Sequence, residues 1–269
     1  MTGEAAFAGG NARNSIALKA AEKRFGAPGV GVQALTPTTL DIVGEEMTIL
    51  LGPSGCGKTT MLRLIAGLEP PTSGNIEVGG ANLWANNRRN VQALSQLGMV
   101  FQDANLFPWL TIEDNIALPL KLRGVAKATR LNKARELCEL VGILGFEKRL
   151  PRELSGGMRQ RAAIARALSY DPGILLMDEP FGALDAMTRD TMNLELQRIW
   201  METRKTIVLV THSIGEAVFL ANRIVLLSPR PGRVQEVIDV PFARPRDPGI
   251  HGTPEFQAIV AELRGKLEH

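Results

Sequence analysis

The sequence has little cysteine, with two residues among 269. Cys56 lies in a glycine-rich segment and Cys138 lies in a predicted helix, so nothing indicates a disulfide between them. A small secreted fold held together by disulfides is therefore excluded, and a reducing, cytosolic setting fits better. A hydrophobic content of 45% is enough for one large α/β domain with its own core.

Long apolar runs are also absent, since no stretch approaches the roughly 18 residues needed to span a bilayer. Residues 1–14 contain no cationic segment that leads into an apolar one, so we predict a disordered leader rather than a secretory signal. Lys and Arg number 31 against 28 Asp and Glu, a net charge of +3 without a dense basic block. We therefore expect no nucleic-acid partner, and any work at a membrane to be done from outside the bilayer.

A glycine-rich segment with P-loop spacing is the strongest motif that is present. It follows an apolar strand at 47–51, precedes a helix at 61–67, and reads Gly52, Pro53, Ser54, Gly55, Cys56, Gly57, Lys58, Thr59, Thr60. The glycines let backbone amides converge on a polyphosphate, which also meets the positive end of the helix. Lys58 supplies charge for the terminal phosphates, and Thr59 can bind Mg²⁺. A glycine-rich turn with a surface lysine is the alternative, but the spacing and both flanking elements favour nucleoside triphosphate binding.

Apolar strands alternate with amphipathic helices along most of the chain. Strands are predicted at 97–101, 174–177, 206–210 and 223–227, which indicates a mostly parallel sheet covered on both faces. The first 30 or so residues of the domain, 15–43, contain two or three strands, with Thr36-Pro37 expected to be a turn.

Helical patterns replace strands between about 103 and 167. Leu137, Leu140, Val141 and Leu144 recur at helical spacing and predict one apolar face. We therefore predict a domain at 15–240 with a helical subdomain inserted at about 103–167. Residues 241–269 form a C-terminal extension that ends in a helix.

Two acidic residues end the predicted strand at 174–177. Asp178 and Glu179 point to opposite sides of that strand, so they can take different roles at the edge where parallel sheets bind ligands. Asp178 suits the metal, directly or through a water, and Glu179 suits the attacking water as general base or orienting group. The alternative, that they only mark a strand end, is disfavoured by the P-loop in the same sheet.

A second predicted anion site opens the helix after residue 154. Ser155 is a natural N-cap, and Gly156 and Gly157 leave the first amides of that helix uncovered. Alone this is a weak signal, since many helices begin with Ser and Gly.

Taken together, these motifs resemble the ATP-binding subunit of an ABC transporter. The Leu154-Ser155-Gly156-Gly157-Met158 segment resembles the signature motif of that family, although Met158 replaces the commoner Gln. The P-loop, Gln102, the two acids, Asp185 and His212 follow in the order of the family. The resemblance extends from Phe25 to at least Leu227. It implies a P-loop NTPase with an N-terminal antiparallel β-subdomain and an inserted helical subdomain.

The resemblance also implies roles for single residues. Phe25 would stack on adenine, or else it is a core residue. Gln102 would contact Mg²⁺ and the attacking water, and His212 would contact the terminal phosphate and hold that water. Ser155, with the glycines after it, would bind the γ-phosphate held by the P-loop of a second copy, so ATP would join a homodimer. Asp185 would bridge the dimer interface, or it is only a helix cap.

The amino-acid sequences of two loops resemble those of the nitrate, sulfonate and taurine importer branch. One loop contains Leu106, Phe107, Pro108 and Trp109, which would receive a helix of the permease, unless it is a core loop. The other is 228–233. This resemblance implies two integral-membrane permease subunits, a solute-binding protein acting indirectly, and a peripheral location on the cytoplasmic face of the inner membrane.

Two alternative functions remain at this point. ABC-type ATPases also serve DNA repair and translation, but such proteins usually carry a long coiled coil, zinc sites or a second cassette, and this sequence has none. An exporter or lipid-transport subunit is the other alternative, because import and export are not distinguished by these residues.

Overall fold

The computed structural model describes residues 14–26, 31–86 and 88–268. The predicted disordered leader therefore lies outside the described residues, apart from Asn14. The strands are β1 (Ile16–Phe25), β2 (Val32–Ile42), β3 (Met47–Leu51), β4 (Ser73–Val78), β5 (Ala81–Asn82), β6 (Trp84–Ala85), β7 (Arg88–Arg89), β8 (Leu97–Val100), β9 (Ile174–Asp178), β10 (Thr206–Thr211), β11 (Arg223–Leu227) and β12 (Val234–Asp239). The helices are α1 (Lys58–Ile65), α2 (Val91–Leu94), α3 (Ile112–Leu122), α4 (Lys127–Leu140), η2 (Pro151–Glu153), α5 (Gly156–Leu168), α6 (Ala186–Thr203), α7 (Ile214–Leu220), η3 (Pro248–Gly252) and α8 (Pro254–Glu268).

A six-stranded sheet forms the centre of the molecule, in the order β12-β11-β3-β10-β9-β8. Its strands are parallel except for β12, which pairs antiparallel with β11. Neighbouring side chains on β3 enter different cores, Ile49 packing with α5 to α8 and Leu50 packing with α1. Both faces of the sheet are thus covered, as its continuous apolar strands predict.

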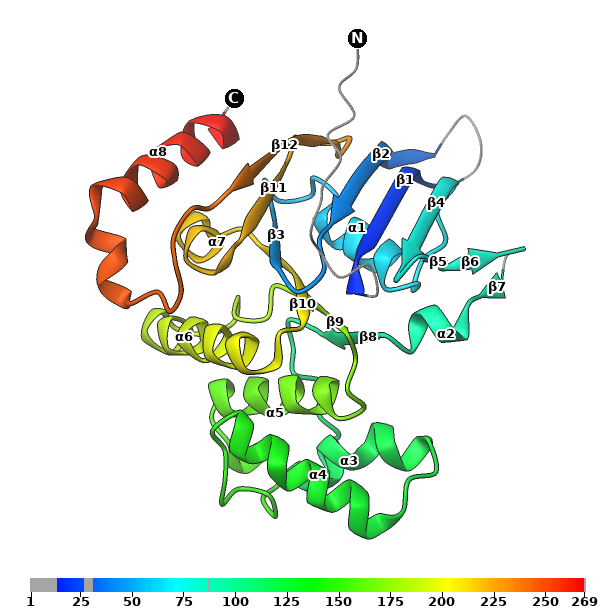
Figure 1. The fold of residues 1–269 in the computed structure, drawn as a ribbon, viewed down its shortest axis with the longest axis vertical. Coiled ribbons are helices and arrows are strands. Elements are labelled where there is room, and N and C mark those ends of the chain that lie inside the picture. The colour runs from blue at the N-terminus through cyan, green and yellow to red at the C-terminus, as the bar shows by residue number, and fades with distance from the viewer. Residues whose placement is uncertain (1–13, 27–30, 87, 269) are drawn as a thin grey trace.

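A smaller antiparallel sheet, in the order β2-β1-β4-β5, lies beside α1 (Figure 1). Strand β2 runs through Pro37, so the predicted turn at Thr36-Pro37 is wrong. Proline has no N–H to donate, but it is tolerated here because β2 is an edge strand and its pairing with β1 shifts register near Thr38. The observed architecture is the predicted one: α/β, with a mostly parallel sheet and an N-terminal antiparallel sheet.

Helices α3, α4 and α5 follow β8 and precede β9 along the chain. They pack together at the opposite end of the molecule from β1, β2 and β4 (Figure 1). The predicted apolar face of α4 is only partly correct. Leu137 and Val141 are buried, but the helix ends at Leu140, and Leu144 beyond it is exposed. Gly142, with φ of +67°, ends the helical course of the chain before Leu144.

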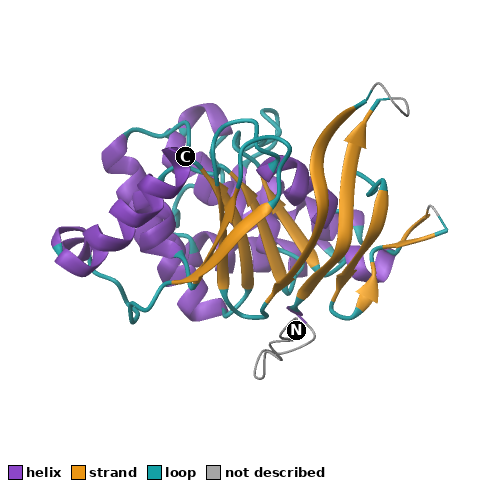
Figure 2. Ribbon diagram, turned by 90° about the horizontal axis from the view of Figure 1, so that it is seen from above, coloured by secondary structure: helices purple, strands orange, loops and turns teal. Residues whose placement is uncertain are grey.

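The C-terminal segment returns across α7. Arg246 is buried and its Nη1 donates hydrogen bonds to the carbonyl oxygens of Val218 and Phe219, at 3.0 and 2.7 Å. Arg244 likewise donates to the carbonyl oxygen of Leu220. These two guanidinium groups satisfy carbonyls at the C-terminal end of α7 that would otherwise lack donors. Helix α8 then packs on α7 and lies at one flank of the molecule (Figure 1). Figure 2 shows helices both beside the strands and behind them.

Candidate functional site: a phosphate-binding loop and two acids at the sheet edge

The glycine-rich segment connects β3 to α1 at the carboxyl edge of the central sheet. Gly55 and Gly57 have φ angles of +74° and +106°, in the left-handed region that favours glycine. A Cβ at Gly57 would lie 2.7 Å from the carbonyl oxygen of Ala34, so this position also needs the smallest side chain. The resulting loop curls around the N-terminus of α1, a geometry that suits a bound polyphosphate.

Lys58, the first residue of α1, is held against the loop. Its side chain is buried, and Nζ donates hydrogen bonds to the carbonyl oxygens of Gly52 and Pro53, at 2.8 and 2.9 Å. The ammonium group therefore lies at the centre of the loop rather than on the surface. This placement argues against the alternative of a glycine-rich turn with a surface lysine.

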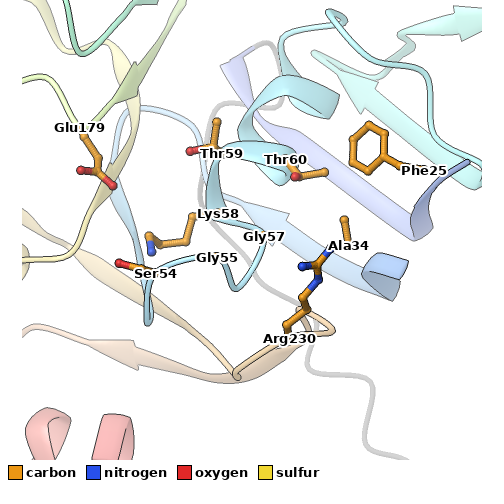
Figure 3. A pocket seen from close by; sticks show the side chains of 10 residues that line it. All are labelled: Phe25, Ala34, Ser54, Gly55, Gly57, Lys58, Thr59, Thr60, Glu179 and Arg230. Atoms are coloured by element: carbon orange, nitrogen blue, oxygen red, sulfur yellow. The ribbon is translucent and has the colours of Figure 1, made fainter. Parts of the chain in front are cut away.

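A cavity of about 330 Å³, which we call the nucleotide cavity, extends along the loop. Its lining brings together residues from β1, β2, the P-loop, α1, the end of β9 and the β11–β12 connection: Phe25, Ala34, Ser54, Gly55, Gly57, Lys58, Thr59, Thr60, Glu179 and Arg230. Figure 3 shows Glu179 and Lys58 toward one end of the cavity and Phe25 toward the other. Phe25 is 42% exposed, so the alternative that it is a core residue is wrong. An open aromatic ring at this end is available to stack on a base.

Asp178 and Glu179 separate into two environments, as their alternation along the chain predicts. Thr59 Oγ1 donates a hydrogen bond to Asp178 Oδ1 at 2.9 Å, so helix α1 and strand β9 meet at these two oxygens. Burial raises the pKa of Asp178, and the hydrogen bond from Thr59 partly opposes that rise.

Glu179 lies on the other side, with Oε2 3.0 Å from Nδ1 of His212. Its φ of +44° is unusual for a residue with a side chain. A methyl group at Gly182 would contact both the Gln102 amide and the Glu179 carboxylate, so these two side chains approach each other at Gly182. Gln102, Glu179 and His212 thus form one group of polar side chains beside the P-loop.

Ser155, Gly156 and Gly157 do not join the nucleotide cavity of their own chain. Ser155 is the N-cap of α5, and its Oγ accepts a hydrogen bond from the Met158 amide at 3.3 Å. Ser155 and Gly157 line a different cavity, of about 350 Å³, beside α6. The helix N-terminus that we predicted as a second anion site therefore lies on another part of the surface, with Ser155 exposed.

Asp185 also lies outside the nucleotide cavity. It is the N-cap of α6, where its carboxylate accepts hydrogen bonds from the amide and hydroxyl of Thr188, at 3.0 and 2.7 Å. Both bonds lower the pKa of Asp185. Within one chain, this residue is a helix cap.

Several residues near the site were not predicted from the sequence. Ala34 and Arg230 line the nucleotide cavity, and Arg189 and Glu216 line a small cavity next to Glu179 and His212. Glu216 is buried, accepts a hydrogen bond from the Thr211 hydroxyl, and has its pKa raised by burial. A sequence signal existed only for Arg230, which lies between two prolines in the loop that indicated the importer branch.

The loop after Gln102 presents its aromatic side chains to solvent. Trp109 is 72% exposed, and its ring lies 5.5 Å from that of Phe107. Pro108 is exposed and Leu106 is half-buried, so the core-loop alternative is wrong for all but Leu106. The buried Asn115 side chain fixes the loop, accepting a hydrogen bond from the Phe107 amide at 2.7 Å and donating to the carbonyls of Phe107 and Leu110 at 3.1 Å.

The family model described as ABC transporter matches residues 35–182, more than half of the chain. The chain belongs to the ABC transporter family. It is 48% identical to the taurine import ATP-binding protein TauB of Escherichia coli, over 80% of this chain and 81% of that protein. It is 45% identical to an uncharacterized ABC transporter ATP-binding protein of Methanocaldococcus jannaschii, over 84% of this chain and 82% of that one.

The fold is also that of a solved ATP-binding cassette in a dimeric, post-hydrolysis state bound to ADP and phosphate. The TM-score is 0.73 at 32% identity, and the match covers 85% of this chain and 100% of that one. This ABC protein is thus an ATPase subunit, which binds ATP and couples its hydrolysis to transport. Among the described residues, none of the helices combines the length and apolar character that crossing a bilayer requires.

Proposed function

We propose that this ABC ATPase powers import of taurine, a sulfonate, nitrate or a related small anion. The main support is the similarity to TauB proteins, such as that of Burkholderia thailandensis, which is 47% identical over 87% of this chain. The sequences of the loops 106–109 and 228–233 add to this support. Relatives of this kind extend over most of both chains and are named as import proteins. They disfavour the alternatives of a DNA-repair or translation factor, and of an exporter or lipid-transport subunit.

The working unit is proposed to be a homodimer with ATP between the copies. The observation that carries this proposal is the separation of two phosphate-binding features in one chain: the P-loop lines one cavity, and the Ser155 helix N-terminus lies elsewhere on the surface. Each feature supplies only part of the donors that a triphosphate needs. Two copies arranged face to face would complete each other, with Asp185 at the interface between them.

Magnesium is proposed to bind next to the P-loop. The donor set fits, because Thr59 and Asp178 place a hydroxyl and a carboxylate oxygen 2.9 Å apart. Gln102 is proposed to add its side-chain amide oxygen as a further ligand. No group of three or more His, Cys, Asp or Glu residues suited to a metal occurs among the described residues. Phosphate oxygens and waters would complete the coordination shell, and the bound ion would neutralise charge on the phosphates.

Hydrolysis is proposed to depend on Glu179 and His212. Glu179 can accept a proton from the attacking water, or orient that water, because its carboxylate borders the cavity beside the P-loop. His212 holds the carboxylate through Nδ1, which leaves Nε2 free to face the terminal phosphate. Lys58 and the loop amides stabilise the charge that develops on the phosphoryl group.

Coupling to transport is proposed to occur through the loop 106–109. Exposed aromatic side chains on a loop fixed by a buried amide make a firm surface for a partner helix. We propose that two integral-membrane permease subunits supply those helices at the cytoplasmic face of the inner membrane. The solute-binding protein would then act only indirectly, through the permease.

Co-purification and reconstitution with a candidate permease test the proposal. The protein should co-purify with the permease, and taurine, alkanesulfonate or nitrate with the matching solute-binding protein should stimulate ATP hydrolysis in proteoliposomes. Failure of all these anions to stimulate an otherwise active complex would refute the substrate class. Absence of any integral-membrane partner, with salt-sensitive DNA binding instead, would refute the transport assignment.

A further inference from the structure

The loop between β11 and β12 places an arginine at the nucleotide cavity. Arg230 lines that cavity together with Phe25, Ala34 and Gly57. Figure 3 shows its side chain extending toward Ala34, at the Phe25 end of the cavity rather than the Glu179 end. Because the P-loop lysine marks the terminal phosphates, this end must receive the sugar and the first phosphate of a nucleotide.

The loop that carries Arg230 is tied to the walls of the cavity. The Gly232 amide donates to the carbonyl oxygen of Ala34 at 3.1 Å, and the Thr36 amide donates to the carbonyl oxygen of Gly232 at 2.8 Å. A Cβ at Gly232 would collide with the backbone oxygen of Cys56, so the loop also packs closely on the P-loop itself. Ser228 Oγ donates to the carbonyl of Pro229 at 3.0 Å, and prolines flank Arg230 on both sides. The arginine is therefore presented from a fixed position.

The charge of Arg230 is not compensated within the part of the chain that the structure describes. Its side chain is exposed, and no carboxylate of the described residues forms an ion pair with it. Glu179, the acidic residue in the lining of the cavity, lies toward the other end (Figure 3). A guanidinium group offers several donors in a plane that matches phosphate oxygens, so it suits an anion better than it suits a free base.

We propose that Arg230 is a nucleotide-binding residue that donates hydrogen bonds to the ribose and α-phosphate of ATP. This assignment rests on the nucleotide cavity described above and adds a contact from outside the P-loop. Since the ribose and α-phosphate are common to ATP, ADP and UTP, the contact raises affinity without selecting for the number of phosphates or for the base.

Equilibrium binding of unlabelled nucleotides to the full chain, by titration calorimetry, tests the proposal. Arg230→Ala should raise the Kd for ATP, ADP and UTP by a similar factor, roughly 5- to 20-fold. Arg230→Lys, which keeps the charge but not the planar fork, should lose less. Arg233→Ala is the matched control, because Arg233 is exposed on the same loop but does not line the cavity. It should bind all three nucleotides as the unaltered protein does.

Each remaining outcome overturns the assignment. Unchanged affinity in Arg230→Ala, or an equal loss in Arg233→Ala, means that Arg230 makes no specific contact. Loss confined to ATP would place the contact at the γ-phosphate, and a much larger loss for ATP than for UTP would make it a base contact. Failure of the unaltered protein to bind any nucleotide would instead refute the cavity itself.

Discussion

The Glu179 carboxylate lies against the His212 imidazole, with Oε2 3.0 Å from Nδ1. The two residues follow the adjacent parallel strands β9 and β10, where Asp178 pairs with Val210, so the sheet register alone brings them side by side. The His212 side chain is 56% exposed and that of Glu179 27%, which leaves both accessible to water and phosphate. The pair depends on the sheet for its position and not on a flexible loop.

Glu179→Gln should stop steady-state hydrolysis while leaving nucleotide binding intact. The amide keeps the shape of the carboxylate and can still accept a hydrogen bond from His212, but it cannot take a proton from water. We expect kcat to fall by about 100-fold or more and an ATP-bound dimer to accumulate, as seen by phosphate release and light scattering. Lys58→Ala is the contrasting variant, because it should weaken ATP binding itself. Hydrolysis near the normal rate in Glu179→Gln would exclude Glu179 from the catalytic role.

Ser155→Arg should block dimer closure without preventing ATP binding to one chain. Ser155 is exposed, so a single chain can hold the larger side chain, whereas a partner seated on this helix N-terminus cannot. Size-exclusion chromatography of the Glu179→Gln protein, with and without Ser155→Arg, measures this effect. Ser155→Gly is the control for the lost N-cap, which costs only a few tenths of a kcal/mol with glycine. An ATP-dependent dimer that forms normally in Ser155→Arg would contradict the proposed interface.

Trp109→Ala should uncouple transport from hydrolysis. Because the Trp109 side chain is 72% exposed, the isolated subunit should keep its fold. Its ATPase rate should change by no more than about twofold. Uptake and permease-stimulated hydrolysis should fall by roughly tenfold if the indole is an anchor for the permease. Leu122→Ala, at a side chain 80% exposed on the same helical region, is the control and should transport normally. Equal uptake by both variants would remove Trp109 from the coupling surface.

Asp178→Asn should abolish magnesium-dependent hydrolysis yet stabilise the nucleotide-free protein. Burial raises the folded-state pKa of Asp178 above its ordinary value of 3.8. At a pH between 3.8 and the raised pKa, the folded chain therefore holds a proton that the unfolded chain releases. Stability therefore declines as pH rises through that window, and the cost persists at neutral pH. The Asn variant lacks this cost and keeps an acceptor for Thr59. Thermal unfolding at pH 5 and pH 8 should show a higher Tm for the variant at pH 8, and a lower Tm there would contradict the pKa direction.

Much of the nucleotide site could be predicted from the sequence. Its residues are either close together in the sequence or lie at the ends of neighbouring strands. The P-loop is one continuous segment, and the positions of Asp178, Glu179 and His212 follow from the strands that precede them. Arg230 could not be placed in this way, since its contact with the cavity depends on how Gly232 packs against Cys56 and Ala34. Such packing between distant segments leaves no local pattern in the sequence.

The errors in the fold have a similar origin. Pro37 was interpreted from its local preference for turns, whereas its position at an irregular edge pairing lets β2 continue. Leu144 matched the spacing of α4, but Gly142 ends that course two residues earlier. In both cases, local preference was overridden by a feature that depends on neighbouring strands or on a single backbone angle.

Arg244 and Arg246, which donate hydrogen bonds to the end of α7, limit how far this protein can be shortened. Cutting the chain after residue 240 would look harmless from the family match, which stops at residue 182. It would nevertheless strip donors from the carbonyls of Val218 and Phe219 and expose the apolar surface under α8. Each orphaned buried carbonyl costs about 1–3 kcal/mol. Helix α7 starts two residues after His212, so a loosened α7 would displace that side chain. The shortened protein would then lose activity because its structure is disturbed, and an activity assay alone could mistake this loss for the removal of a regulatory segment.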